Sequence, residues 1–322
     1  MKNIGIIIEF EPEHKSGKKK IKPGCFGVIT LARQDNTELF AFAINSDIKA
    51  LKPDLEAYGI TNIVDVVLEP EYQNNPVVRA KAMIKAVLKF HINAIIGLST
   101  SMGKDLLPRM AAQLDVPLVM NCINVDLENN LAKTSQYSGK AIATVKTTGD
   151  IPIFGVRPNL VEPINAQATA RILTFDGVDL VTKKLNVLKT GENDKSTNIN
   201  LAEADIIIAG GRGIKNKDNF TILSQCAEKL NAAVGASRVA VDEGWVPYSM
   251  QVGQTGEKVS PKVYIACGIS GSIQHFAGMK TSGMVIAINK DENAPIISNC
   301  DYYVKADVLK IIPELTKLLN NE

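Results

Sequence analysis

The stretch NAIIGLSTSMGKDLLPRMAAQLD, residues 93–115, decides the fold class. Its first six residues form a short apolar run, which is typical of a buried strand. From Gly103 onward the apolar residues recur at helical spacing, so we expect a helix to begin there. A strand that is followed at once by a helix is the repeating unit of a parallel sheet covered by helices.

The glycines of this stretch invite comparison with a nucleotide-binding P-loop. Such a loop needs four residues between its glycines, then Lys, then a Ser or Thr whose hydroxyl reaches magnesium. Here five residues separate Gly97 from Gly103, and Asp105 follows Lys104 where the hydroxyl would stand. Because a carboxylate at that place would repel phosphate, we do not predict an ATP site. Lys104, Asp105 and Arg109 are expected near a helix start, in structural or partner contacts.

The same alternation of strands and helices extends outward from this stretch. Apolar runs with flanking turn residues predict strands, and apolar residues at helical spacing predict helices. The expected strands are 3–8, 39–44, 62–68, 93–98, 141–147 and 151–157, and the expected helices are 47–59, 75–91 and 103–115. Continuous apolar strands between helices predict an N-terminal α/β domain with a parallel sheet, over residues 1–190.

A second domain is predicted after a polar stretch rich in turn formers, KTGENDKSTNIN (189–200), in which we place a linker at 191–200. The pattern then restarts over residues 201–322, which we expect to form a doubly wound, Rossmann-like domain. Pro313 is expected to kink or restart the terminal helix. The expected strands are 204–210, 262–268, 283–289 and 302–306, and the expected helices are 218–232 and 271–280, followed by the terminal one.

Composition narrows the function classes. The net charge of +2 offers no electrostatic argument for nucleic acid or an anionic membrane. The apolar runs are too short to span a bilayer, and no targeting segment is visible, so we predict a cytoplasmic protein without membrane insertion. Five scattered cysteines without CxxC spacing and only three histidines argue against disulfides and metal sites.

The chemistry is expected in the second domain. YIACGISGSIQH (264–275) predicts a strand, a Gly-Ser turn and a helix start, an arrangement whose free amides favour a pyrophosphate. It is not the G-x-G-x-x-G fingerprint, and a tight turn without a ligand is an equal alternative. Residues 234–256 form a long polar stretch with little periodicity, which is usually functional. No catalytic triad or carboxylate pair can be assembled, so binding of a polar, planar ligand is favoured over bond breaking.

Several blocks of the second domain together resemble one family. GGRG (210–213), VDEGWVP (241–247), MQVGQTG (250–256) and PKVYIACGISGSIQHFAGM (261–279) occur in the order and spacing typical of the alpha subunit of electron-transfer flavoprotein. The resemblance runs from Ala204 to about Leu319, and GKDLLPRMAAQL in the first domain is similar to a helix of the same family.

This resemblance implies an electron carrier rather than a substrate-converting enzyme. The alpha subunit would hold one FAD and pair with a beta subunit, which would hold AMP or a second FAD. Electrons would come from primary dehydrogenases, such as the acyl-CoA dehydrogenases of fatty acid β-oxidation, and pass to a quinone oxidoreductase or another acceptor. Two alternatives remain open at this point: an electron-bifurcating, NADH-dependent complex, and a non-redox nucleotide-binding or interaction module.

The resemblance also implies which residues contact FAD. Arg238 and His275 would stabilise the negative charge of the reduced flavin, although a surface ion pair and a packed helix start are their respective alternatives. Thr255 would lie near flavin N5 or serve as a turn hydroxyl. The implied cofactor-binding residues are Arg212, Ser237, Arg238, Gln251, Val252, Gly253, Gln254, Thr255, Gly268, Ser270, Gly271, Ser272, Ile273, Gln274, His275, Asn289, Lys290, Asp307 and Val308, and none is assigned to catalysis or to a metal.

Overall fold

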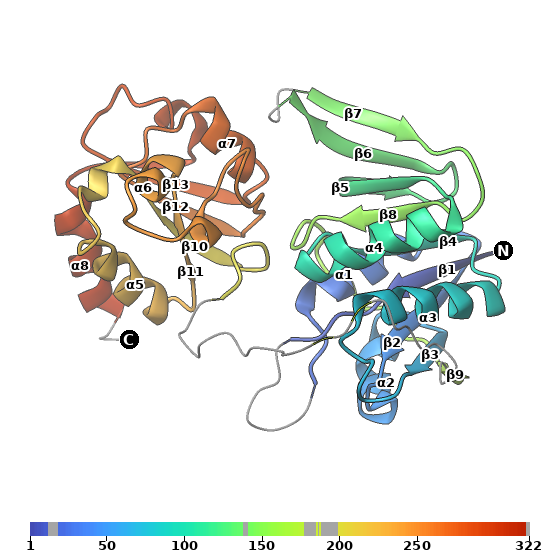
Figure 1. Cartoon of the computed structure of the whole chain (residues 1–322). Helices are drawn as coiled ribbons and strands as arrows, with labels where there is room; N and C mark the ends of the chain where they lie inside the picture. The colour runs from blue at the N-terminus through green and yellow to red at the C-terminus, as the bar shows by residue number, and fades with distance from the viewer. Residues whose placement is uncertain (12–18, 138–140, 177–184, 186, 188–198, 320–322) are drawn as a thin grey trace. The chain divides into compact units, whose positions relative to one another are not determined.

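The computed structural model describes residues 1–11, 19–137, 141–176, 185, 187 and 199–319 (Figure 1). The chain divides into two compact units. The first comprises the described residues of 1–135 and 142–191, and the second those of 136–141 and 192–322. Residues 191–198 of the predicted linker lie outside the described residues.

A nine-stranded sheet forms the first unit, in the order β7-β6-β5-β8-β4-β1-β2-β3-β9. Its strands from β8 to β9 pair in parallel, as expected, and β5 continues the parallel pairing with β8, whereas β6 pairs antiparallel with β5. The strands are β1 (Lys2–Ile7), β2 (Thr37–Ile44), β3 (Asn62–Val67), β4 (Ala94–Leu98), β5 (Leu118–Asp126), β6 (Leu131–Gln136), β7 (Ala141–Lys146), β8 (Ile153–Val156) and β9 (Arg171–Asp176).

Helices cover both faces of this sheet: α1 (Pro23–Ala32) and α2 (Ile48–Ala57) on one, α3 (Pro76–Lys89) and α4 (Ser101–Leu114) on the other. Side chains alternate along a strand, so Ile4 and Ile6 pack toward α1 and α2 while Ile7 packs toward α3 and α4. Burial of both faces explains why the central strands β1, β4 and β8 are apolar at nearly every position.

Several features of the first unit differ from the expectation, and among them the strands β5, β6 and β9 were not predicted. Helix α4 begins at Ser101, two residues earlier than predicted, because the Thr100 side chain accepts a hydrogen bond from the Gly103 backbone and caps the helix. Helix α1 was not predicted, since PGCFGVITLA is apolar on almost every side and has no helical stripe. Gly27 within it is required by packing: a Cβ there would lie 2.4 Å from the Val161 carbonyl oxygen.

The second unit contains a five-stranded, all-parallel sheet in the order β11-β10-β12-β13-β14. This doubly wound order reverses between β10 and β12, and ligands of such sheets bind outside the strand ends at that point. The strands are β10 (Ile206–Gly210), β11 (Ala233–Ala236), β12 (Val263–Cys267), β13 (Met284–Asn289) and β14 (Tyr302–Lys305). The helices are α5 (Phe220–Lys229), α6 (Arg238–Asp242), α7 (Ile273–Met279) and α8 (Val308–Leu319). Short 3₁₀ turns lie at Arg212–Ile214, Tyr248–Met250 and Ile297–Asn299.

Helix α8 runs through Pro313 without restarting. Proline removes one backbone hydrogen bond, but the buried side chains of Val308 and Ile312 pack in a core cluster with α5 and hold the helix together. None of the helices in the described part of the chain is both long enough and apolar enough to cross a membrane.

Candidate functional site

A cavity of about 660 Å³ lies at the carboxyl ends of β10, β11, β12 and β13. Each of these strands contributes a residue at or just after its last position: Arg212 after β10, Ser237 after β11, Gly268 after β12, and Asn289 at the end of β13. The cavity therefore occupies the point where the strand order reverses, which is where open α/β sheets bind ligands. Its volume is within the range of pockets that enclose small molecules and cofactors.

Two glycines bring the turns after β10 and β12 into direct contact. Gly268 has a φ of +60°, and a Cβ built on it would lie 2.7 Å from the Cα of Gly213. The Gly213 backbone N–H donates to the Gly268 carbonyl at 3.0 Å. Any side chain at either position would push the two turns apart. We call the contact between Gly213 and Gly268 the floor of the cavity.

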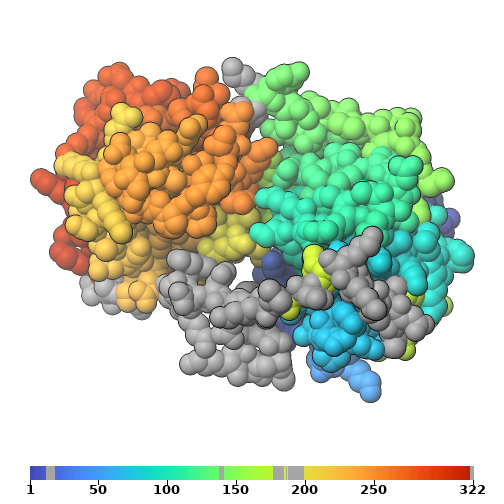
Figure 2. Space-filling view, in the orientation of Figure 1, coloured from blue at the N-terminus to red at the C-terminus, as the bar shows by residue number. Residues whose placement is uncertain are grey.

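The polar stretch after β11 forms a wall of the cavity. It was expected to be irregular, but it contains α6 and is tied to the sheet by the Val252 N–H, which donates to the Ala236 carbonyl at 2.9 Å. The Gln254 N–H donates to the Gln274 carbonyl at 2.8 Å, so the wall also rests on the start of α7. This segment, orange in Figure 2, lies at the surface of the second unit.

His275 is the most deeply buried titratable group of the cavity, with an exposed fraction of 5%. Its Nε2 lies 3.0 Å from the hydroxyl of Tyr264, which is fully buried on β12. Burial lowers the pKa of His275 to about 4, and the nearby Val252 backbone offsets part of that shift without completing a hydrogen bond to Nδ1. The imidazole is therefore neutral at pH 7.

Tyr264 determines which nitrogen of His275 carries the proton. A buried hydroxyl needs an acceptor for its hydrogen, and among the described residues Nε2 is the hydrogen-bond partner of this one. Tyr264 therefore donates to Nε2, and the single imidazole proton resides on Nδ1. Nδ1 completes no hydrogen bond of ordinary geometry among the described residues, although the Val252 backbone lies close to the ring, so a ligand in the cavity can accept the Nδ1 hydrogen.

We expect the cofactor-free chain to lose stability as the pH falls from about 6.5 to about 4. The pKa of His275 is lower in the folded chain than in the unfolded chain, so the unfolded chain takes up the proton first. The shift corresponds to a loss of about 3 kcal/mol at most. Urea unfolding at a series of pH values should show this slope flattened in His275→Gln but kept in His91→Gln, since His91 is exposed. An unchanged slope in His275→Gln would contradict the assignment.

The charge of the cavity favours an anion. Arg212, Lys215 and Arg238 line it, against the single carboxylate of Asp291. The Arg238 side chain is 68% exposed and its Nε lies 3.2 Å from an oxygen of Asp242, one helical turn away. The surface ion pair that was the alternative interpretation is therefore present, although Arg238 also lines the cavity. An exposed pair of this kind is weak enough to be exchanged for a ligand.

The residues present fit a large polar cofactor. Two buried polar atoms at the cavity have no hydrogen-bond partner in the described residues, the hydroxyl of Ser237 and Nδ1 of His275. Unsatisfied buried groups are rare in native proteins and mark places where a ligand or water completes the bonding. Together with the glycine floor and the excess of cations, they match a ligand with phosphates and a planar ring that carries hydrogen-bond acceptors.

Most residues implied by the sequence resemblance meet at this cavity. Thr255, which accepts a hydrogen bond from the Gln251 side chain at 3.0 Å, is among them, so its two interpretations are compatible. The implied residues that line the cavity are Arg212, Ser237, Arg238, Gln251, Val252, Gly253, Gln254, Thr255, Gly268, Ser270, Ser272, Gln274, His275 and Asn289.

Five implied residues do not line the cavity. Gly271 packs against the backbone of Ile296, and Ile273 projects into solvent. Lys290 and Asp307 form an ion pair at 2.7 Å, and Val308 is buried in the core beside α5. Their assignment to FAD remains a prediction.

Six further residues line the cavity and were not singled out. Gly213 lies in the GGRG block, and the spacing of the glycines in that block could have indicated that it lines the cavity. The others are adjacent in sequence to predicted residues or reach the cavity only through folding: Lys215, Val239, Ile269, Asp291 and Ala294. No cluster of three or more potential metal ligands occurs among the residues that the structure describes.

Comparisons with known proteins agree with this site. A family model described as the electron transfer flavoprotein FAD-binding domain matches residues 200–280, which include most of the cavity. A second, described as the electron transfer flavoprotein domain, matches residues 13–180.

Curated relatives match over most of the chain. A probable mitochondrial electron transfer flavoprotein subunit alpha from Caenorhabditis elegans is 37% identical, with 93% of this chain and 90% of the relative covered. The electron transfer flavoprotein subunit alpha of Thermoanaerobacterium thermosaccharolyticum is 38% identical over 88% of each chain. That of Pseudomonas aeruginosa is 44% identical over 73% of this chain and 76% of its own.

Proposed function

Because the chain belongs to the electron transfer flavoprotein family as an alpha subunit with a FAD-binding domain, we propose that FAD occupies the cavity at the ends of β10–β13. The observation that carries this placement is the pair of buried, unpartnered polar atoms of Ser237 and His275, which line the same cavity as the Gly213–Gly268 contact. FAD, when bound, supplies one- and two-electron redox chemistry.

The two ends of the cavity are suited to different parts of FAD. The glycine turns, with Arg212 and Lys215 beside them, would hold the pyrophosphate, because close backbone approach and positive charge both favour phosphate there. The wall from Gln251 to Thr255 and the imidazole of His275 would hold the flavin ring. Gln251, Val252 and His275 are buried at this end, so they would shield part of the ring from water.

Arg238 and His275 would favour the reduced, negatively charged flavin in different ways. Arg238 brings a permanent positive charge, because guanidinium does not lose its proton in proteins. His275 brings a neutral N–H donor that Tyr264 holds in place. A charge-assisted hydrogen bond contributes about 1.5–3 kcal/mol, roughly twice the contribution of a neutral one, so Arg238 should have the larger effect.

The partners are proposed from the family. We expect a heterodimer with a beta subunit that holds AMP or a second FAD, electrons arriving from dehydrogenases such as acyl-CoA dehydrogenases, and a quinone oxidoreductase or another acceptor receiving them. The relatives' names describe them as alpha subunits, which supports a partner subunit. A cytoplasmic location stays a prediction.

The test is to produce the chain together with its partner subunit and to analyse the purified complex. An absorption spectrum and a count of released nucleotides should give one FAD in the alpha subunit, with one AMP in the partner for a simple electron carrier. Two FAD per complex would favour the bifurcating alternative. A colourless complex would contradict the proposed function. The alpha chain alone should bind FAD poorly or aggregate, because the surface that its partner covers would be exposed.

A further inference from the structure

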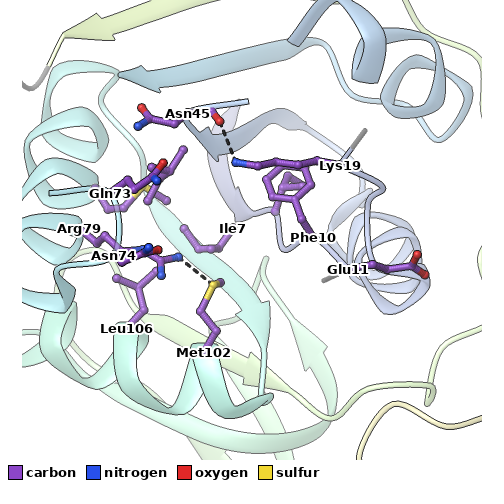
Figure 3. Close-up of a pocket in the computed structure, with 13 residues that line it drawn as sticks. Ile7, Phe10, Glu11, Lys19, Asn45, Gln73, Asn74, Arg79, Met102 and Leu106 are labelled. Atoms are coloured by element: carbon purple, nitrogen blue, oxygen red, sulfur yellow. Dashed lines mark hydrogen bonds between the residues drawn. The ribbon is translucent and has the colours of Figure 1, made fainter. Parts of the chain in front are cut away.

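A second cavity, of about 190 Å³, lies within the first unit at the carboxyl ends of β1 and β2 (Figure 3). It is lined by residues of α3 and α4, by the loop before α3, and by Phe10, Glu11 and Lys19 from the segment after β1. The strand order of this sheet reverses between β1 and β4, so the cavity is beside the reversal point of its own sheet. None of its residues belongs to the FAD cavity.

The helix start in GLSTSMGKD is already occupied by an anion of the protein itself. The Thr100 hydroxyl lies 2.7 and 2.8 Å from the two carboxylate oxygens of Glu9, which is 1% exposed. Lys22 pairs with the same carboxylate at 3.2 Å. Because Glu9 neutralises the positive end of α4, a phosphate has no place at that helix terminus. A ligand of this cavity must be recognised by another group.

Arg79 is that group. It projects from α3 into the cavity, its Nε is buried without a hydrogen-bond partner in the described residues, and its Nη2 donates to the Met102 sulfur at 2.9 Å. Thioether sulfur is a weak acceptor. No carboxylate lies within 4.0 Å of the guanidinium in the described part of the chain. Burial lowers the pKa of Arg79, and the more distant charges of Glu9 and Asp105 oppose that shift.

A partly buried guanidinium whose hydrogen-bond partner is a thioether is costly, because no carboxylate of the described residues lies close enough to pair with it. The rest of the cavity is lined by apolar and amide groups, together with the charged side chains of Lys19 and Glu11. In Figure 3 Arg79, Asn74 and Met102 stand on one side, and Phe10 and Lys19 on the other, with Ile7 between them. Lys19 donates to the Asn45 carbonyl at 3.0 Å, which places a second cation at the cavity.

We propose that this cavity binds a small organic anion, whose carboxylate or phosphate group bonds to Arg79 and whose apolar body packs against Ile7 and Met102. The volume sets the size of that body. A closed cavity of about 150 Å³ holds benzene, and pockets for drug-sized ligands begin at about 300 Å³. The cavity of about 190 Å³ therefore suits a single ring or a short acyl chain with one charged group and is too small for a whole nucleotide.

The NMR signals of methionine methyl groups can report whether a ligand binds in this cavity. Met83 and Met102 line the cavity, whereas Met279 and Met284 belong to the second unit and serve as internal controls. The full chain, in complex with its partner subunit and labelled at the methionine methyl carbons, would be titrated with benzoate, phenyl phosphate, inorganic phosphate and the uncharged analogue benzyl alcohol while NMR spectra are recorded.

Benzoate or phenyl phosphate should shift the Met83 and Met102 signals saturably and leave those of Met279 and Met284 unchanged. Benzyl alcohol should bind at least about tenfold more weakly, which is the size expected for losing a charge-assisted hydrogen bond. The stronger of the two anions identifies the charged group. A response to inorganic phosphate alone, or no saturable response to any anion, would overturn the proposal.

Two variants test whether Arg79 itself binds the anion. Arg79→Gln should weaken the response to the preferred anion about tenfold or more. Arg109→Gln is the matched control, because Arg109 lies on the adjacent helix α4 in an exposed pair with Asp105 at 2.8 Å. Equal affinity in Arg79→Gln and the unaltered protein would overturn the assignment. If Arg79→Gln does not fold, the contrast between benzoate and benzyl alcohol in the unaltered protein decides alone.

Discussion

Arg238→Gln should lower the reduction potential of the bound flavin by about 65–130 mV, which is 1.5–3 kcal/mol expressed for one electron. Reduction adds negative charge to the flavin, and Arg238 is a cavity-lining cation that cannot lose its proton. Arg238→Lys should fall between the two proteins, because a point charge replaces a planar, delocalised cation. A spectroelectrochemical titration of the FAD-loaded complex measures these potentials.

The ion pair between Arg238 and Asp242 allows a second variant to test the same role of Arg238. If Arg238 leaves that exposed pair to contact the flavin, Asp242→Asn should raise the potential by removing a competing negative charge. Arg109→Gln removes a cation from a comparable pair in the first unit and should leave the potential unchanged. If Arg238→Gln also left the potential unchanged, Arg238 would be only a surface residue.

Gly268→Ala should abolish stable FAD binding, with a loss of about a hundredfold or more in affinity. The residue has a φ of +60°, which alone costs about 1–2 kcal/mol for alanine. The added Cβ would also lie 2.7 Å from the Gly213 Cα, and a backbone atom cannot move aside as a flexible side chain can. The two turns would separate, and about 3 kcal/mol corresponds to the expected hundredfold loss.

Gly244→Ala is the control that shows whether backbone strain alone, without loss of the cavity floor, explains the effect of Gly268→Ala on FAD binding. Gly244 has a φ of +70°, close to that of Gly268, but a Cβ there would meet nothing within 4 Å. This variant should be mildly destabilised and keep its flavin. The ratio of absorbance at the flavin band to protein concentration, followed by fluorescence titration with FAD, measures both variants. Equal loss of FAD in the two would attribute the effect to strain alone.

Local sequence signals predicted most of the secondary structure. Apolar runs such as NAIIGL and helical stripes such as that of residues 75–91 appear as β4 and α3, because strand and helix periodicities are legible over a few residues. The prediction was wrong where local and tertiary preferences diverge. Helix α1 has no polar face to reveal it. Helix α8 continues through Pro313 instead of restarting there, because packing against α5 outweighs one lost hydrogen bond, while the predicted kink at Pro313 stays a prediction.

The sequence blocks that contain the site residues were predictable, but the positions of these residues in space were not. The glycine turns and the polar stretch 234–256 were visible in the sequence, and most of the implied residues line one cavity. Nothing in the sequence distinguished Lys290 and Asp307, which pair with each other, from Asn289, which faces the cavity. Strand order decides which turns meet, and several sheet orders are compatible with one succession of strands and helices.

By itself, the sequence determined the α/β class, the family and the residue types available for a flavin, since each depends on short-range pattern or on ordered blocks. Only the tertiary structure decided that Tyr264 pairs with Nε2 of His275 and that Glu9 closes the start of α4. It also decided that Arg79 faces a cavity while forming no ion pair with the described carboxylates. The physical reason is distance along the chain. Glu9 and Thr100 are 91 positions apart, and a hydrogen bond depends on separation in space, which folding alone sets.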